Sequence, residues 1–386
     1  MARPQCLAMA PQRMQCNVRK ENMLNHKPMT SHFYPRCLLA LGAAVFCAGL
    51  GAQPAGTFED PLDVSATMVS APASRPLMAI TSAGNRLVAL GMRGLIVISD
   101  DAGQSWRQAS APVQSDLLAV HFPTPSKGWA VGHDGVILHS TDAGLTWAKQ
   151  SDGRIAATTM MAEYRTRISA GETAIQPYLD QLALNFKQGP SLPYLGIYFT
   201  DEQQGFAVGS FGTLVSTRDA GKTWHAALDR IDNPQFLHLN AIREIAGTLY
   251  IAAEKGTVFR QDKTTGQFRQ IQTGYGGSFF GIAGNREQLL AYGLRGNVHQ
   301  SRDQGQTWAA IRTPLQGTVT GGVYMPTRRA VVLSTVAGEV ASIDTDRGDV
   351  RPLVPPRPAA LTGVEGLKNG NMVYTSLSGV ITTQAQ

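Results

Sequence analysis

A short signature occurs four times in the same register along this chain of 386 residues. Each copy places a Ser or Thr, an Asp, a Gly, a second Ser or Thr and a closing Trp at fixed offsets, over Ser99 to Trp106, Ser140 to Trp147, Thr217 to Trp224 and Ser301 to Trp308. Each copy follows a short apolar run that glycines introduce. A pattern with a fixed period predicts an array of similar units, each made of a hairpin, a strand and a tight turn.

The residue types of the signature favour a structural role over a catalytic one. Asp and Ser side chains accept hydrogen bonds from backbone N–H groups a few residues further on, Gly tolerates positive φ, and a Trp ring covers the turn. We therefore assign a turn-stabilising role to twelve residues, which are Asp101, Gly103, Trp106, Asp142, Gly144, Trp147, Asp219, Gly221, Trp224, Asp303, Gly305 and Trp308.

The period of the repeat predicts the fold. The second glycine before each apolar run recurs at Gly94, Gly135, Gly212, Gly256, Gly296, Gly338 and Gly379, with spacings of 41, 77, 44, 40, 42 and 41 residues. Repeats of about 40–45 residues with four short strands are typical of propeller blades. The sequence therefore predicts an all-β, seven-bladed β-propeller over residues 53–386. Residues 57–69 precede the first inner strand, and we expect them to supply the outer strand of blade seven.

The long spacing between blades two and three predicts an insertion over residues 154–189. Ile175, Tyr178, Leu179, Leu182 and Phe186 recur at helical intervals, with Pro177 near the expected first turn. A weaker stripe runs from Met160 to Ile168, so two short helices joined around Gly171 are expected. Two interpretations stay open, which are a helical hairpin that decorates the ring and an arm that binds a partner through Tyr178, Leu182 or Phe186.

Residues 1–52 differ from the rest of the chain and read as a leader with a secretory signal peptide. An apolar run over 38–50 follows Arg36 and is too short to span a bilayer. The true start is expected at Met1 or at Met29, and cleavage after Ala52 predicts a periplasmic or secreted protein, or a lumenal one in a photosynthetic source. Lipid anchoring at Cys47 is the second choice, because Phe46 at the preceding position fits a lipoprotein cleavage site poorly.

Removal of residues 1–52 would change the charge and the cysteine content of the chain. Six of the 34 Lys and Arg residues and one of the 28 acidic residues lie in 1–52, so the remainder is nearly neutral, which gives no support to a nucleic-acid partner. All four cysteines lie there too. The six remaining histidines show no ligand spacing. We expect no metal site, no cofactor and no catalytic residue.

Blade two carries a resemblance to a known family. The segment from Leu118 through Gly128-Trp-Ala-Val-Gly-His-Asp-Gly135 to Asp142-Ala-Gly-Leu-Thr-Trp147 closely resembles the photosystem II stability/assembly factor family, which consists of seven-bladed Asp-box propellers. The resemblance implies a non-enzymatic factor that binds a membrane-protein precursor, partly through an arginine-rich patch. Arg93 and Arg295 occupy matching hairpin positions, with Lys255 at a third.

Propeller topology places these cations together with the insertion. The hairpin between strands two and three shares a face of the disc with the connection to the next blade, so Arg93, Lys255 and Arg295 are expected on the same face as 154–189, and the Asp boxes on the other. This face is the predicted site for a membrane protein or envelope complex, with no nucleic acid, no small-molecule substrate and a monomeric chain.

A hydrolase is the alternative function, because Asp boxes also occur in sialidases. Such an enzyme needs an arginine cluster and a nucleophilic Tyr with a Glu. Arg93, Arg243 and Arg295, with Tyr194 or Tyr198, are the residues that could form such a site, although no spacing supports it.

Overall fold

The computed structural model describes residues 59–189, 191–354 and 357–383. The chain divides after Gly56 into two units, and the first unit lies outside the described residues, as does the predicted leader over 1–52. No helix among the described residues is long and apolar enough to cross a membrane.

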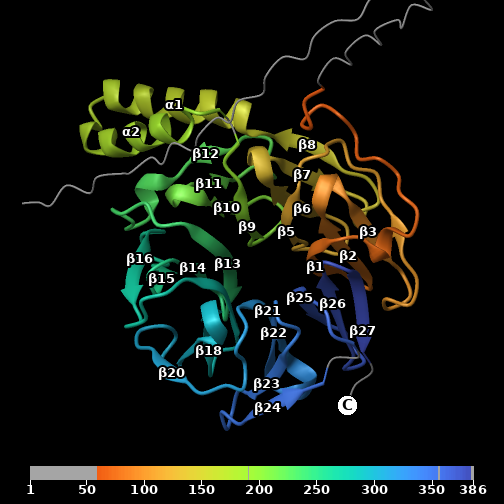
Figure 1. Ribbon diagram of the computed structural model, residues 1–386. Helices are drawn as coiled ribbons and strands as arrows, with labels where there is room; N and C mark the ends of the chain where they lie inside the picture. Colours follow the sequence, from red (N-terminus) through yellow and green to blue (C-terminus); the bar gives the residue numbers. More distant parts are fainter. Residues whose placement is uncertain (1–58, 190, 355–356, 384–386) are drawn as a thin grey trace, which may run out of the picture. The chain divides into compact units, whose positions relative to one another are not determined.

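The described residues form a ring of seven antiparallel sheets, which confirms the predicted seven-bladed propeller (Figure 1). Six sheets have four strands and the seventh has three. Blades one to three contain β1 (Leu77–Ala83), β2 (Arg86–Gly91), β3 (Ile96–Ser99), β4 (Arg107–Gln108), β5 (Leu117–His121), β6 (Gly128–Gly132), β7 (Ile137–Ser140), β8 (Ala148–Ser151), β9 (Tyr194–Phe199), β10 (Gly205–Gly209), β11 (Leu214–Thr217) and β12 (His225–Ala226).

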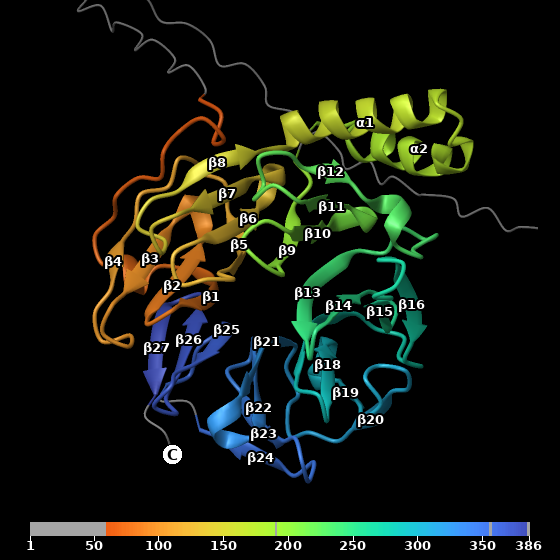
Figure 2. The same ribbon diagram turned by 180° about the vertical axis from the view of Figure 1, so that it is seen from behind.

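Blades four to seven repeat this order with strands that also run from the centre outward (Figure 2). They contain β13 (Leu239–Ile245), β14 (Thr248–Ala253), β15 (Thr257–Gln261), β16 (Phe268–Gln272), β17 (Phe279–Gly284), β18 (Leu289–Gly293), β19 (Val298–Ser301), β20 (Ala309–Ile311), β21 (Val319–Met325), β22 (Ala330–Thr335), β23 (Val340–Asp344), β24 (Val350–Leu353), β25 (Leu361–Gly366), β26 (Met372–Ser376) and β27 (Gly379–Thr383).

The inner strands share one sequence feature that allows the seven blades to pack around the central axis. Each inner strand has a register shift after its first residue, where one residue is left out of the pairing. The next position always holds a small residue, and these are Ala79, Ala119, Gly196, Ala241, Gly281, Gly321 and Gly363. Small side chains there allow neighbouring inner strands to approach each other closely.

The prediction that residues 57–69 complete blade seven is wrong. Residues 59–69 form no strand, and 57 and 58 lie outside the described residues. The segment instead follows blade one, where Ala66 N donates to Ala111 O and Gln114 N donates to Pro61 O. The Ala66 amide and the Pro61 carbonyl therefore bond to the irregular chain after β4, and the Val69 amide donates to the Gln108 side chain at 3.0 Å.

Blade seven closes the ring by packing on blade one. Thr362 Oγ1 donates to Leu77 O at 2.6 Å, and Thr382 Oγ1 donates to Gly103 O at 3.0 Å. Val69 and Val380 both pack against the buried cluster that includes Leu77 and Val97. Side chains and side-chain hydrogen bonds, not an exchanged strand, join the first and last blades.

The predicted helical insertion is present between blades two and three. It consists of α1 (Gly153–Ser169), the 3₁₀ turn η4 (Thr173–Ile175) and α2 (Gln176–Asn185), and lies outside the ring beside β8 and β12 (Figure 1). Asp152 caps α1 by accepting from the N–H groups of Arg154 and Ile155. The other 3₁₀ turns are η1 (Pro72–Ser74), η2 (Met92–Gly94), η3 (His133–Gly135), η5 (Ser210–Gly212), η6 (Leu228–Arg230), η7 (Leu294–Gly296) and η8 (Pro326–Arg328).

Candidate functional site

The hairpins between the second and third strands of the blades gather on one face of the ring, which we call the hairpin face. Their tips bond to the connections that lead into the inner strands: Gly94 N donates to Ser115 O, and His133 N donates to Asp116 O. The glycine at the tip permits this approach, because a Cβ on Gly94 would lie 1.9 Å from Val113 O. The insertion shares this face, as predicted from topology: Gly135 at a tip lies against Gly153 at the start of α1.

Five hairpin tips hold a non-glycine residue in the left-handed region. Arg93, Asp134, Phe211, Lys255 and Arg295 have φ between 52° and 57°. This conformation is costly for residues with a Cβ, by roughly 1–2 kcal/mol each. Four of the five are exposed; Asp134 is half-buried, and its carboxylate accepts from the Ser115 hydroxyl at 2.7 Å.

The three predicted cations at these tips have no acidic partner among the described residues. The backbone N–H of Arg93 donates to Asp116 Oδ1, but its guanidinium contacts only the amide oxygen of Gln114, at 3.3 Å. Lys255 Nζ donates to Gln235 Oε1 at 2.8 Å. No described side chain bonds to the Arg295 guanidinium. Their positive charge is therefore not neutralised within the described propeller.

Large apolar side chains are exposed on hairpins of the same face, a feature that the sequence pattern did not predict. Nine large hydrophobic residues are exposed among the described residues, and four of them, Met92, Phe211, Val336 and Leu377, lie on second-to-third-strand hairpins. Two others, Ile155 and Leu184, lie on the insertion. None of the nine lies in an Asp-box turn. Exposed apolar residues that gather on one face mark an interaction surface more often than scattered ones do.

The structure places the predicted insertion residues against the ring. Leu182 has no exposed surface, and Tyr178 and Phe186 are half-buried against the same core cluster. The Tyr178 ring meets Phe236 edge-to-face, with 6.2 Å between centroids. Leu182 therefore contributes to docking of the insertion and offers nothing to a partner, while Leu184, which is 63% exposed, points to the outward side of α2.

Ion pairs fix the other side of the insertion. Asp229 accepts from the Tyr164 hydroxyl at 2.9 Å and from the Arg167 guanidinium at 2.7 Å. Burial, followed by the charge of Asp229, raises the pKa of the Tyr164 phenol far above its usual range, so this hydroxyl stays a donor. Asp229 on η6 thus ties the C-terminal half of α1 to blade three.

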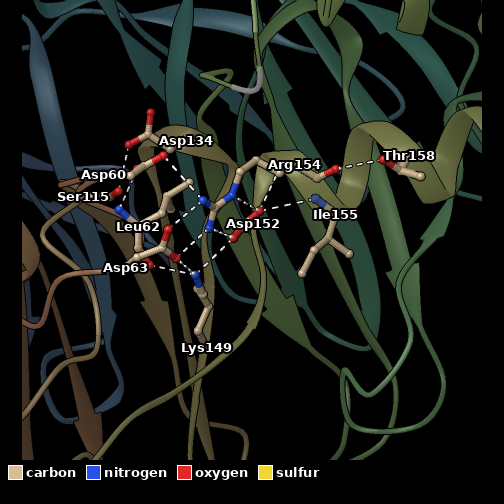
Figure 3. Close-up of polar contacts among 10 residues, drawn as sticks. All are labelled: Asp60, Leu62, Asp63, Ser115, Asp134, Lys149, Asp152, Arg154, Ile155 and Thr158. Carbon is tan, nitrogen blue, oxygen red and sulfur yellow. Dashed lines mark hydrogen bonds and ion pairs between the residues drawn. The ribbon is translucent and has the colours of Figure 1, made fainter. Parts of the chain in front are cut away.

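A charged cluster joins the start of α1 to the segment before blade one (Figure 3). Arg154 lies between Asp63 and the buried Asp152, and Lys149 contacts both carboxylates, at 3.2 and 3.1 Å. The side-chain hydrogen bond from Arg154 is the largest of the effects that hold the pKa of Asp63 well below its usual range. All these groups are satisfied by one another, which indicates a structural junction.

The Asp boxes stabilise turns on the opposite face, as predicted. In the first box, Asp101 accepts from the backbone of Ser105 at 2.9 Å and from the Ser99 hydroxyl at 2.8 Å, and Trp106 Nε1 donates to Gly103 O at 3.2 Å. The side-chain and backbone hydrogen bonds of Ser105 lead the effects that lower the pKa of Asp101 to about 2. The third box differs, because the buried Nε1 of Trp224 has no hydrogen-bond partner among the described residues.

The arginines that a sialidase-like site would need lie on different elements. Arg93 and Arg295 are at hairpin tips of blades one and five, whereas Arg243 lies on the inner strand β13 and lines the central channel. Tyr194 is buried and Tyr198 stacks on His121, with 4.1 Å between centroids. No group of three or more His, Cys, Asp or Glu residues that could hold a metal ion occurs among the described residues.

Fold and turn chemistry together define a seven-bladed Asp-box β-propeller with a helical insertion. Solved structures agree at the level of the fold. A structure titled "YCF48 bound to D1 peptide" has a TM-score of 0.59 at 13% identity and covers 83% of this chain and 96% of that one. "Crystal structure of WD40 beta propeller domain of Doa1" has a TM-score of 0.58 at 10% identity, covering 84% and 97%.

Sequence comparison confirms the resemblance to the photosystem II stability/assembly factor family. The family model described as "Photosynthesis system II assembly factor YCF48" matches residues 80–169. Photosystem II assembly protein Ycf48 of Synechococcus sp. (strain JA-2-3B'a(2-13)) is 30% identical over 152 residues, covering 36% of this chain and 44% of the relative. Ycf48 of Synechococcus sp. (strain JA-3-3Ab) is 26% identical over 189 residues, covering 45% and 56%. The matches thus span about half the length of these relatives.

Proposed function

We propose that this propeller is a non-catalytic binding factor that engages a membrane protein through its hairpin face during assembly. The observation that carries the proposal is the mixed character of that face. It carries three cations without an acidic partner among the described residues and four exposed apolar side chains, which are Arg93, Lys255, Arg295, Met92, Phe211, Val336 and Leu377. Apolar contacts with interspersed charge are typical of protein-binding surfaces. The relatives that match in sequence are named as photosystem II assembly proteins, and one structural neighbour is titled as bound to a D1 peptide.

The two kinds of side chain have different tasks in this proposal. Exposed cations gain little free energy each, so they are expected to act on the association rate and on its salt dependence. The apolar tips lose contact with water when a partner covers them and are expected to slow dissociation. A partner with an acidic segment next to an apolar one would contact both the cations and the apolar tips.

We further propose export of the chain to the periplasm or a comparable compartment, with residues 1–52 removed. The apolar run over 38–50 and the absence of cysteine after residue 52 support this proposal. Mass spectrometry of the N-terminus of the protein isolated from its source tests it. A mature chain that retains residues 38–50 contradicts it.

The binding proposal is tested by capture from detergent-solubilised membranes of the source organism, with crosslinking and identification of the captured protein. Arg93→Glu combined with Arg295→Glu should weaken capture several-fold at low salt and less at high salt. Arg218→Glu is the matched control, because Arg218 is an exposed arginine in an Asp-box turn on the opposite face. Equal capture by the wild type and the hairpin-face variant contradicts the proposal.

A further inference from the structure

The centre of the ring contains a cavity that the proposed function does not use. Its volume is about 300 Å³, and its walls are formed by residues of the seven inner strands and by Tyr292 of β18. Most of the lining is small or apolar, with Ala79, Gly196, Gly281 and Gly321 from the close-approach positions and Phe280 and Leu118 from the unpaired ones. This volume lies at the lower end of the range for small-ligand pockets.

Arg243 is the one charged residue in this lining among the described residues. It lies on β13, opposite Tyr250 in the pairing with β14. Its Nη1 donates to Ile242 O at 3.0 Å, and no described carboxylate lies within 4.0 Å of the guanidinium. Because a guanidinium carries five N–H donors, most of the hydrogen-bonding capacity of Arg243 is left for a ligand.

Two other inner strands carry titratable groups on which the charge of Arg243 acts, Glu365 on β25 and His121 on β5. Glu365 on β25 accepts from the Ser82 hydroxyl at 2.7 Å. Burial, which outweighs the Ser82 hydrogen bond and the charge of Arg243, raises the pKa of Glu365 to about 7, so this carboxyl is a weak counter-ion near neutral pH. His121 accepts from Phe199 N at its Nδ1, at 3.1 Å, and burial lowers its pKa to about 3, so it adds no charge. Neither Glu365 nor His121 belongs to the lining, which among the described residues holds one positive charge and no negative one.

The shape and charge of the cavity select a ligand class. A carboxylate matches the planar fork of a guanidinium with two parallel hydrogen bonds. The single cation, Arg243, balances one negative charge, which disfavours a doubly charged phosphate. The small and apolar residues of the lining suit a short aliphatic tail. We propose that the central cavity binds a carboxylate with a short apolar tail, held by Arg243. The carboxylate belongs either to a free organic acid or to the C-terminus of a peptide.

Calorimetric titration of the purified propeller tests this proposal without any variant. Hexanoate and the tripeptide Ala-Ala-Leu are the two acid probes, and hexanamide and the tripeptide amide are their neutral controls. At least one acid should bind below about 10 mM and its amide at least about tenfold more weakly. Binding of hexanoate alone assigns a free organic acid, and binding of the tripeptide alone assigns a chain terminus. Failure of both acids, or equal binding of acid and amide, overturns the proposal.

Variants then locate the site. Arg243→Gln should weaken binding of the acid at least about tenfold, with an unchanged melting temperature as the check of folding. Arg295→Gln removes an arginine from a hairpin tip and should leave acid binding unchanged. This pair separates the two proposals, because loss of membrane-protein capture in Arg295 variants and loss of carboxylate binding in Arg243→Gln are independent results. Unchanged acid binding in folded Arg243→Gln overturns the assignment.

Discussion

The guanidinium of Arg154 forms a two-pronged ion pair with the carboxylate of Asp63, with both N to O distances at 2.8 Å (Figure 3). The two residues are 91 positions apart in the sequence. The pair connects the chain before blade one to the first turn of α1, so the base of the insertion is fixed by a segment that lies along blade one.

The charges of this cluster are expected to contribute unequally. Asp152→Ala removes the cap of α1 and a buried acceptor of both Arg154 and Lys149, and should lower the free energy of unfolding by about 2 kcal/mol. Asp63→Ala removes an exposed partner and should have a much smaller effect. Urea unfolding of both variants gives the comparison. An Asp63 variant that is destabilised more than the Asp152 variant would show that the segment before blade one, not the cap, holds the helix.

The insertion offers a matched pair of leucines two residues apart. Leu182→Ala opens a cavity between α2 and the ring and should cost about 2–4 kcal/mol of stability. Leu184→Ala changes an exposed side chain and should leave stability nearly unchanged while weakening partner capture if the outward side of α2 contributes to binding. Thermal unfolding and capture are measured on the same preparations. Equal destabilisation by the two substitutions contradicts burial of Leu182 and exposure of Leu184.

The Asp boxes predict a loss of stability in acid. The hydrogen bonds of Thr307 lead the effects that lower the pKa of Asp303 to about 2, below the value of about 3.9 in an unfolded chain. A depressed pKa in the folded state stabilises the fold above the unfolded value, and this stabilisation is lost as pH falls from about 4 to about 2. The melting temperature of the wild type should therefore drop in this interval, and Asp303→Asn should be less stable at pH 7 and lose less on acidification. A parallel pH profile for the variant contradicts this explanation.

The Glu365 carboxyl is expected to have the opposite effect, a loss of stability as pH rises toward neutrality. Its folded-state pKa of about 7 lies above the value of about 4.3 for an exposed Glu, so its contribution to stability is complete below about pH 4 and is lost as pH rises to about 7. Ser82 and Arg243 are the described groups that act on this carboxyl. Glu365→Gln keeps an oxygen acceptor for Ser82 and should gain roughly 1–3 kcal/mol over the wild type between about pH 5 and 8. Unfolding free energies that show no such pH-dependent difference contradict burial of the ionised carboxyl as the cause.

The local turns and the blade count followed from the sequence because both depend on short-range chemistry. The Ser99 hydroxyl, the Asp101 carboxylate and the Gly103 amide lie within five residues of one another, and their bonds are set by that spacing. The stripe from Ile175 to Phe186 likewise predicted which side of α2 is buried. The pattern alone did not show that this side faces the ring rather than a partner.

The features that could not be predicted from the sequence depend on packing between residues far apart in the chain. Residues 59–69 alternate well enough for a strand, but their amides bond to chain near Ala111 and to the Gln108 side chain. Met92 and Leu377 resemble core residues in the sequence and are exposed only because the hairpins end there. Arg243 lines the channel because β13 is an inner strand, and the channel forms only when the inner strands of all seven blades come together.

Site-specific photo-crosslinking tests the use of the hairpin face most directly. A photoreactive amino acid is placed at Met92 or Leu377 on the hairpin face, and at Gln104 or Gln306 in Asp-box turns as controls, since all four side chains are exposed. After irradiation in intact membranes of the source organism, adducts with one membrane protein should form from Met92 and Leu377 and not from the two glutamine positions. Adducts that form equally from both faces, or from the Asp-box turns alone, would contradict partner binding through the hairpin face.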